Sequence, residues 1–104
     1  MDIKKIAKLA KNDKFAIKKH AAIRMRQRLI TVDDIKEALM SAQIIETYED
    51  DYPFSSCLLL GYSGEKSLHI VSAISNIDDI LLIITAYRPS IDEWLPGFVK
   101  RRTK

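Results

Sequence analysis

The sequence predicts an α+β protein in which N-terminal helices pack on one face of an antiparallel sheet of about four strands. Residues 2–40 place apolar side chains at helical spacing. Residues 43–87 instead hold short apolar runs separated by turn residues, as in "SSCLLLGYSGEKSLHIVSAIS". The chain has 104 residues, of which 47% are hydrophobic, as is typical of one globular domain. Helices that precede strands in this order indicate the α+β class.

Two helices are expected at the start of the chain. The first spans residues 2–11, where isoleucines and alanines recur on one face. The second runs from Phe15 to about Arg28, and Asn12 or Asp13 is its expected N-cap. Its apolar residues lie on one side of a helical wheel and its cations on the other.

A third helix is expected to begin after Thr31. Asp34 stands three residues further on, which is a weaker form of the capping box. The buried stripe of this helix is predicted to be Ile35, Ala38 and Leu39.

Four strands are expected in "QIIETYED", "SSCLLLGYS", "SLHIVSAIS" and "ILLIITAY", joined as a meander. In the third strand, His69, Val71 and Ala73 share a face. The fourth is apolar on both faces, so we expect a central strand that is covered on both sides. Thr85 and Tyr87 share a face near its end, and "SIDEW" is expected to form one helical turn.

Charge divides the chain into three expected parts. Residues 1–30 hold ten Lys and Arg against two Asp, whereas residues 31–98 hold three against twelve acids. We expect a basic helical extension at 1–14, a single α+β domain at 15–98 and a basic tail at 99–104. Basic segments around an acidic middle favour a polyanionic partner, and a role in solubility explains the same charges equally well.

Several classes of function receive no support from the sequence. No apolar run approaches the roughly 20 residues that span a bilayer, so no membrane partner is expected. The N-terminus is too polar for a secretory signal, which favours the cytoplasm. Cys57 is the sole cysteine, and no spacing suggests a zinc site. With three glycines there is no phosphate loop, and we expect neither a metal nor another cofactor.

The stretch "KKHAAIRMRQR" carries the strongest chemical signal. His20, Arg24 and Arg28 stand four residues apart on the polar side of the second helix. Histidine exchanges a proton near neutral pH, and a guanidinium binds phosphate through two parallel hydrogen bonds. The row therefore indicates a surface for a phosphate group.

His69, in the middle of a strand, adds a second imidazole to this inventory. Thr85, Tyr87 and Arg88 end the neighbouring strand. Two imidazoles and a pair of arginines suit metal-free cleavage of RNA, in which the ribose 2′-hydroxyl attacks its own phosphate. This hypothesis requires that folding brings His20 and His69 to one open cleft.

Structural explanations exist for the same residues. A half-buried ring that is satisfied by a backbone carbonyl explains His69 better than catalysis does. Tyr87 is explained by an aromatic at the core edge, Arg88 by an exposed turn charge and Trp94 by a lid over the core. Arg24 and Arg28 have acidic candidates for ion pairs in the next helix, at Asp33, Asp34 and Glu37.

Three stretches together resemble a known family: "KKHAAIRMRQRLITVDDIKEAL", "YPFSSCLLLGYSGEKSLHIVSAI" and "ILLIITAYRPSIDEW". They are similar to small proteins of unknown function, which in turn resemble RelE/MqsR-like toxins of the barnase–EndoU–colicin–RelE ribonuclease superfamily. Members of the family are often encoded beside an antitoxin with a YgiT/MqsA-type zinc-finger domain. The resemblance implies a metal-independent ribonuclease fold. Carried over by position, it implies site roles for His20, Arg24, Arg28, His69, Thr85 and Tyr87.

The expected function is therefore the toxin of a toxin–antitoxin pair, an endoribonuclease that cleaves mRNA. The six residues just named form its expected catalytic set. The expected RNA-binding residues are Lys18, Lys19, Arg26, Arg88, Lys100, Arg101 and Arg102. The expected partners are RNA and a cognate antitoxin. The alternative is a non-enzymatic module that uses the same basic face to bind RNA or an acidic protein.

Overall fold

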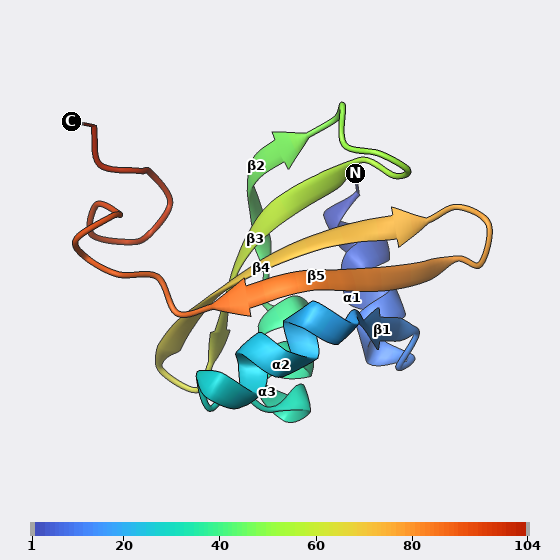
Figure 1. Ribbon diagram of the computed structural model, residues 1–104, viewed down its shortest axis with the longest axis horizontal. Helices are drawn as coiled ribbons and strands as arrows, with labels where there is room; N and C mark the ends of the chain where they lie inside the picture. The colour runs from blue at the N-terminus through green and yellow to red at the C-terminus, as the bar shows by residue number, and fades with distance from the viewer. Residues whose placement is uncertain (1, 104) are drawn as a thin grey trace.

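Five strands form one mixed sheet in the computed structural model, which describes residues 2–103 (Figure 1). The sheet has the order β1-β5-β4-β3-β2, in which β1 is parallel to β5 and the other neighbours are antiparallel. The predicted α+β class is confirmed. The elements in chain order are α1 (Ile3–Lys11), β1 (Phe15–Ile17), α2 (Lys19–Gln27), α3 (Val32–Met40), β2 (Gln43–Tyr48), β3 (Ser56–Ser63), β4 (Lys66–Ser75) and β5 (Ile80–Tyr87).

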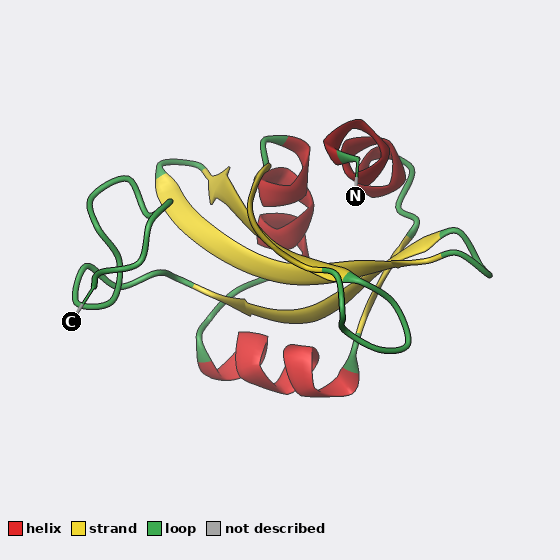
Figure 2. Ribbon diagram, turned by 90° about the horizontal axis from the view of Figure 1, so that it is seen from above, coloured by secondary structure: helices red, strands yellow, loops and turns green. Residues whose placement is uncertain are grey.

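The helices occupy two positions relative to the sheet. Figure 2 shows α1 and α3 together on one side of the sheet and α2 apart from them. α2 packs against β5, beyond the point where the short β1 ends. Two hydrogen bonds join this part of the chain to the edge of β5, from Lys18 N to Ile83 O (3.0 Å) and from Arg28 Nη1 to Ala86 O (2.7 Å). α2 therefore covers backbone acceptors that an open strand edge leaves to solvent.

The second expected helix was wrong over its first residues. Residues 15–17 form β1, and the helix begins only at Lys19. Phe15 pairs with Leu81 and Ile17 pairs with Ile83, so this segment adds a parallel fifth strand to the expected four. Three residues are too few for their own pattern to separate strand from helix, and pairing with a distant strand decides between them.

Two helices begin with a side-chain N-cap, and the N-cap expected for the remaining helix is absent. Thr31 and Asp34 form the predicted capping box, with both hydrogen bonds present at 2.9 and 3.0 Å. Asp2 caps α1 through the backbone N–H of Lys4. The expectation of a cap for α2 at Asn12 or Asp13 was wrong, because Asn12 ends α1 and β1 intervenes before α2.

The core lies between the sheet and the helices. Ile6 of α1 and Ile35 of α3 are fully buried there, together with Leu59 of β3. β5 was expected to be covered on both faces, but only the face toward the helices is covered. On the opposite face Ile84 is 39% exposed. That open face also carries Thr85, next to Val71 of β4. No helix within residues 2–103 is long and apolar enough to cross a bilayer.

Candidate functional site

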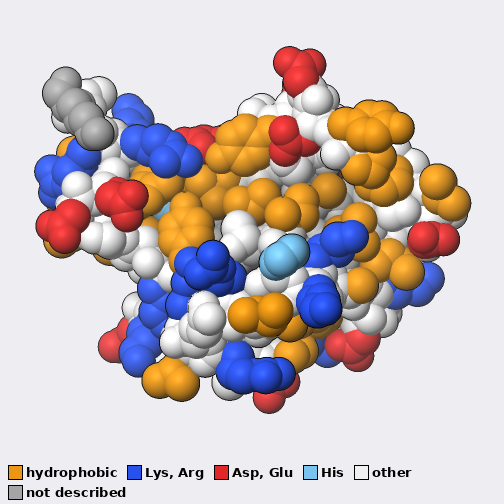
Figure 3. Space-filling model, in the orientation of Figure 1, with side chains coloured by type: hydrophobic (Ala, Val, Ile, Leu, Met, Phe, Trp, Pro, Cys, Tyr) orange, Lys and Arg blue, Asp and Glu red, His pale blue; other side chains and the backbone are white. Residues whose placement is uncertain are grey.

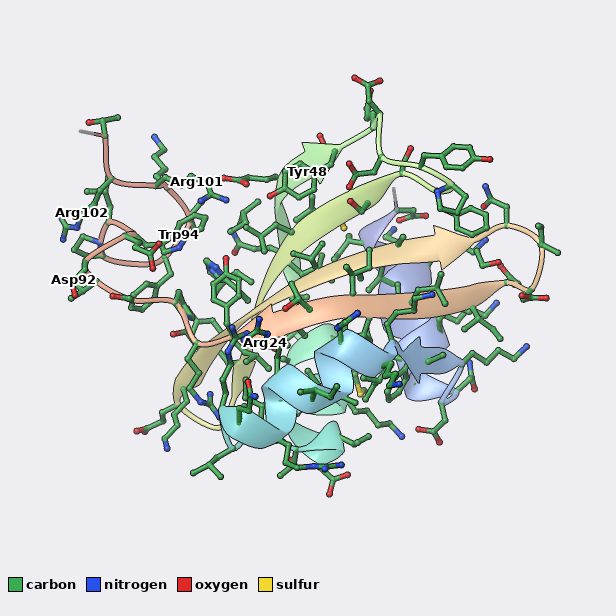
Figure 4. The ribbon with its side chains drawn as sticks, viewed as in Figure 1. Arg24, Tyr48, Asp92, Trp94, Arg101 and Arg102 are labelled. Atoms are coloured by element: carbon green, nitrogen blue, oxygen red, sulfur yellow. The ribbon has the colours of Figure 1, made fainter. Side chains whose placement is uncertain are left out.

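A cationic pocket opens where β5 ends and the chain turns into residues 89–103, which we call the C-terminal segment. The cavity has a volume of about 590 Å³. In Figure 4, Trp94 and Arg101 lie on the C-terminal segment, while Arg24 lies on α2 beside the end of β5. The residues that line the cavity, named here the arginine pocket, are Arg28, Tyr87, Arg88, Glu93, Trp94 and Arg101.

Two of the three guanidinium groups are held by backbone and carboxylate acceptors near the end of the sheet. Arg28 donates to the carbonyl of Ala86 at 2.7 Å. Arg88 donates to the carbonyl of Ser67 at 3.4 Å and lies 3.8 Å from a carboxylate oxygen of Asp34. A guanidinium has five N–H donors, so each retains donors after these contacts. The cations are therefore placed in advance of any ligand.

Arg101 reaches the pocket from the C-terminal segment through a paired contact. Its Nε and Nη2 donate to the two carboxylate oxygens of Glu46 at 2.8 and 3.0 Å. Its guanidinium carbon also lies 4.6 Å from the centre of the Trp94 ring, a cation–π contact. The hydrogen bond from Arg101 lowers the pKa of Glu46, which remains ionised. This pair fastens the C-terminal segment to β2.

A buried imidazole stands behind the tyrosine of the pocket. His69 Nε2 lies 2.8 Å from the carbonyl oxygen of Phe98, and its Nδ1 lies 3.1 Å from the hydroxyl of Tyr87. A carbonyl oxygen only accepts, so Nε2 carries the proton and donates it. The neutral ring then accepts at Nδ1 from the Tyr87 hydroxyl, which leaves the lone pairs of that oxygen for other donors.

Trp94 closes the His69 ring off from solvent. The indole lies edge-on to the imidazole, with a centroid distance of 4.4 Å and an interplanar angle of 85°. His69 is 0% exposed and Trp94 is 2% exposed. Burial lowers the pKa of the His69 imidazole below its ordinary value of 6.5, and burial raises the pKa of the Tyr87 hydroxyl.

Comparison with protein families matches residues 17–88 to the family described as "Domain of unknown function (DUF4258)". The chain belongs to this family. No curated protein and no solved structure matches the chain. The DUF4258 match includes Arg28, Tyr87 and Arg88 of the arginine pocket. Glu93, Trp94 and Arg101 follow its end, so the C-terminal segment completes the pocket from outside the matched region.

The two histidines of this DUF4258 member are not brought to one open cleft. His20 is exposed on α2, whereas His69 is fully buried behind Tyr87 and Trp94. The expectation that both rings line an accessible cleft was therefore wrong, since burial removes His69 from direct contact with a ligand in this conformation. His20 precedes Arg28 by two helical turns, or about 12 Å along the axis.

The other expected site residues divide between the arginine pocket and the surface around it. Arg24 is exposed one turn before Arg28, and Thr85 is half-buried on the open sheet face. Of the expected RNA-binding set, Arg88 and Arg101 line the pocket. Those that lie outside it, all exposed, are Lys18, Lys19, Arg26, Lys100 and Arg102. Figure 3 shows Lys and Arg side chains gathered over α2 and along the lower part of this face.

The ion pairs differ from those expected between α2 and α3. The carboxylate of Asp34 faces Arg88, and also accepts from the Ser63 hydroxyl, the largest cause of its lowered pKa. Neither Arg24 nor Arg28 forms an ion pair with α3 within the described residues. Among residues 2–103 there is likewise no group of three or more His, Cys, Asp and Glu placed to hold a metal ion.

Sequence reasoning missed two contributors to the site, Glu93 and Glu46. Glu93 lines the pocket, and Glu46 holds Arg101 from a strand 55 residues away. No periodicity predicts either position, because the C-terminal segment is irregular and the pairing is long-range. The aromatic Trp94 was the available signal, and its interpretation as a lid agrees with its burial over His69.

Acidification from pH 7 to pH 5 is expected to lower the free energy of unfolding. Burial lowers the pKa of His69 in the folded chain, so below pH 6.5 the unfolded chain binds a proton at this ring more readily than the folded chain does, and acid favours the unfolded state. The pKa values of Asp34 and Glu46 are also lowered. The stabilisation that these carboxylates contribute is lost only near and below pH 3.8 and 4.5, their ordinary pKa values, and therefore below the range from pH 7 to pH 5. Urea denaturation at the two pH values measures the difference.

The control is His69→Gln, which removes the titrating ring and keeps an amide donor for the carbonyl of Phe98. Whatever its overall stability, this variant should lose less free energy of unfolding between pH 7 and pH 5 than the native protein. An equal loss in both proteins would show that His69 is not the group that responds.

Proposed function

We propose that the protein is a metal-independent endoribonuclease, acting on RNA in the cytoplasm as the toxin of a toxin–antitoxin pair. The burial of His69 excludes the form of this reaction in which two exposed histidines act directly, so a different observation carries the proposal. Three arginines surround a single pocket with a tyrosine whose hydroxyl is bound to a neutral imidazole. Arginine forks bind phosphate oxygens, and held cations stabilise the extra negative charge of a pentacoordinate phosphate.

The chemistry assigned to the pocket needs a 2′-hydroxyl on the substrate. As the 2′-oxygen attacks phosphorus, its proton passes to the oxygen of Tyr87, and the Tyr87 hydroxyl proton passes to Nδ1 of His69. The bond from phosphorus to the 5′-oxygen breaks, and that oxygen takes a proton from water. The products are a 2′,3′-cyclic phosphate and a 5′-hydroxyl, and the proton on His69 returns to solvent through Tyr87. In this scheme Tyr87 is the catalytic residue and His69 acts through it.

In this scheme His20 and Arg24 contact the substrate outside the pocket. Both are exposed and stand on the turns of α2 that precede Arg28. A strand whose reacting phosphate lies at Arg28 meets these side chains if it continues along α2. In this scheme His20 contacts the strand beyond the reacting phosphate, and water supplies the proton to the 5′-oxygen.

The toxin assignment rests on the resemblance between the family of this chain and RelE/MqsR-like toxins. In this proposal a cognate antitoxin, with a zinc-finger domain of the YgiT/MqsA type, covers the arginine pocket and blocks access of RNA. Expression of the chain alone should then arrest bacterial growth, and expression of the His20→Ala and Tyr87→Phe variants shows whether arrest depends on either residue.

A second candidate is a non-enzymatic module that binds RNA through the same pocket. The burial of His69 favours it, because a single exposed imidazole supplies less acid–base chemistry than two. In that case the pocket binds RNA without cleaving it, and Tyr87→Phe changes little while loss of Arg28 weakens binding.

Arg28→Ala is expected to reduce cleavage of an RNA tetranucleotide about 100-fold, because it removes one guanidinium from the reacting phosphate. Tyr87→Phe is expected to reduce it by a similar factor through loss of the proton acceptor. The matched control is Arg26→Ala, which removes the same charge from the same helix outside the pocket. The measurement is the rate of product formation in EDTA, with the cyclic phosphate identified by mass spectrometry.

Three results separate the candidates. Cleavage in EDTA that is lost in Arg28→Ala and Tyr87→Phe, and kept in Arg26→Ala, supports the nuclease. Binding without cleavage supports the non-enzymatic module. If the native protein neither binds nor cleaves RNA, both candidates are rejected.

A further inference from the structure

A second basic cavity lies at the opposite end of β5 from the arginine pocket. It has a volume of about 740 Å³ and is formed between α1 and the turn from β4 to β5. In Figure 1 the C-terminal segment lies at the left, whereas α1 and this turn lie toward the right. Its lining includes Lys4, Lys5, Lys8, Lys14 and Asp79, and we call it the α1 groove.

The acids of the α1 groove are already engaged, and most of its cations are not. Asp79 pairs with Lys5 at 2.8 Å, and Asp2 accepts from the backbone N–H of Lys4 as the helix cap. Within residues 2–103, Lys4, Lys8 and Lys14 form no ion pair. The hydrogen bond from Lys5 is the largest cause of the lowered pKa of Asp79, and the charges of Lys14 and Lys8 lower it further. The electrostatic potential in the groove is therefore positive.

The position of these lysines is set by the fold. Ile6 and Leu9 are buried in the core, which fixes the opposite side of α1 toward solvent. The carbonyl of Lys14 accepts from the backbone N–H of Leu81 at 3.0 Å, so Lys14 stands at the start of β5. The ion pair of Lys5 with Asp79 joins α1 to the neighbouring turn.

The lining chemistry favours a nucleic-acid backbone over a protein partner. Protein interfaces take most of their binding energy from buried apolar and aromatic anchors. Among residues 2–103, Leu9 is the one apolar residue that lines the groove, and it is only 5% exposed. Lysines on flexible stems suit phosphates that pass along a groove, because each acts as a point charge without a required geometry.

Cations also follow the edge of β5 between the two sites: Lys14 is bonded at Leu81, Lys18 at Ile83 and Arg28 at Ala86. β5 has eight residues, so its two ends lie roughly 25 Å apart. Lys18 and Lys19 stand at the beginning of α2, between the groove and the row that leads to Arg28. One strand can therefore follow cations from one end of β5 to the other.

We propose that the α1 groove is a second RNA-backbone site, which holds the same strand whose reacting phosphate lies in the arginine pocket. The proposal rests on the proposed function and adds to it a requirement for substrate length. The lysines of the groove precede the matched region 17–88, whereas Asp79 lies within it, so the cations of this site come from outside the region that matches the family.

The test is a triple variant, Lys4→Ala, Lys8→Ala and Lys14→Ala, in the full chain. Alanine favours helix at positions 4 and 8, so α1 should persist, as far-ultraviolet circular dichroism will show. Binding is measured by fluorescence anisotropy with two probes, a tetranucleotide and a dodecanucleotide of RNA that carry a 2′-deoxy sugar at the reacting position. Two single variants form a matched comparison. Lys8→Ala removes one charge from the groove, and its control Lys11→Ala removes one from an exposed position on the same helix outside the groove.

We expect the triple variant to bind the dodecanucleotide at least tenfold more weakly at low salt and to bind the tetranucleotide as the native protein does. Loss of three phosphate contacts to a single strand should reduce the slope of log K against log salt by about 2. Lys8→Ala should show part of this effect and Lys11→Ala none.

Three outcomes would overturn the proposal. They are unchanged binding of the dodecanucleotide, equal weakening for both lengths, and stronger competition by a poly-glutamate peptide than by RNA of equal charge. The last outcome assigns the groove to an acidic protein. Each differs from failure of the proposed function, which appears as absent binding and cleavage of the tetranucleotide by the native protein.

Discussion

Replacing Gly61 by alanine is expected to cost about 3 kcal/mol or more of unfolding free energy. A Cβ at this position would lie 2.1 Å from the carbonyl oxygen of Ala38 and 2.7 Å from its carbonyl carbon. Both atoms belong to the backbone of α3, so the whole helix must move away from β3. Overpacking of a core costs about 1 to 3 kcal/mol where side chains adjust, and here none is available to adjust.

The matched control for this prediction is Gly64→Ala. A Cβ at Gly64 meets nothing within 4 Å, and the cost there is limited to the strain of its positive φ of 61°, about 1 kcal/mol. Urea denaturation of both variants measures the difference. Adding Ala38→Gly should not rescue Gly61→Ala, because the clash is with backbone atoms. A rescue, or equal costs at the two glycines, would contradict the close approach of α3 to β3.

The consequence of Gly61→Ala should extend to the arginine pocket. α3 carries Asp34, whose carboxylate faces Arg88. A helix displaced from β3 carries this acid with it, so a variant that still folds should also bind RNA more weakly under the proposed function. Comparison with Gly64→Ala separates this effect from a general loss of stability.

Trp94→Ala is expected to cost about 3 to 5 kcal/mol and to open the buried histidine to solvent. The indole is 2% exposed and packs against the His69 ring at 4.4 Å, so truncation removes a large buried surface. Without the ring, water reaches the imidazole and the pKa of His69 should rise toward 6.5, since burial is the largest cause that lowers it.

Two measurements check this prediction independently. Denaturation gives the stability, and nuclear magnetic resonance titration of the imidazole protons gives the pKa of His69. Leu95→Ala is the control, because this neighbouring side chain is 39% exposed and should cost less than about 1 kcal/mol. A pKa for His69 that stays low in Trp94→Ala would show that other groups, rather than the indole, keep the ring from water.

Residues close in sequence account for the part of the fold that could be predicted. Thr31 and Asp34 form their box within one turn of chain. The alternation of polar and apolar residues predicted that His69 and Val71 share one face of their strand. In each case hydrogen bonding or side-chain direction over a few residues determines the result.

Long-range pairing decided what the sequence did not reveal about the fold. Phe15 and Ile17 form a strand because Leu81 and Ile83 offer a free edge. Ile84 is exposed because α1 and α2, the helices that pack against β5, leave the face that carries it uncovered. These outcomes depend on which elements meet in three dimensions, and a local pattern contains no information on that.

For the candidate site, the sequence by itself determined its cations and its tyrosine: Arg28 on the polar face of a helix, and Tyr87 and Arg88 at a strand end. The tertiary structure alone decided that Trp94 and the carbonyl of Phe98 bury His69, and that Glu46 brings Arg101 to the same pocket from 55 residues away. The physical reason is range. Residue type and helical spacing assign charge locally, whereas burial, the tautomer of a ring and the pairing of distant charges exist only once separate elements have packed together.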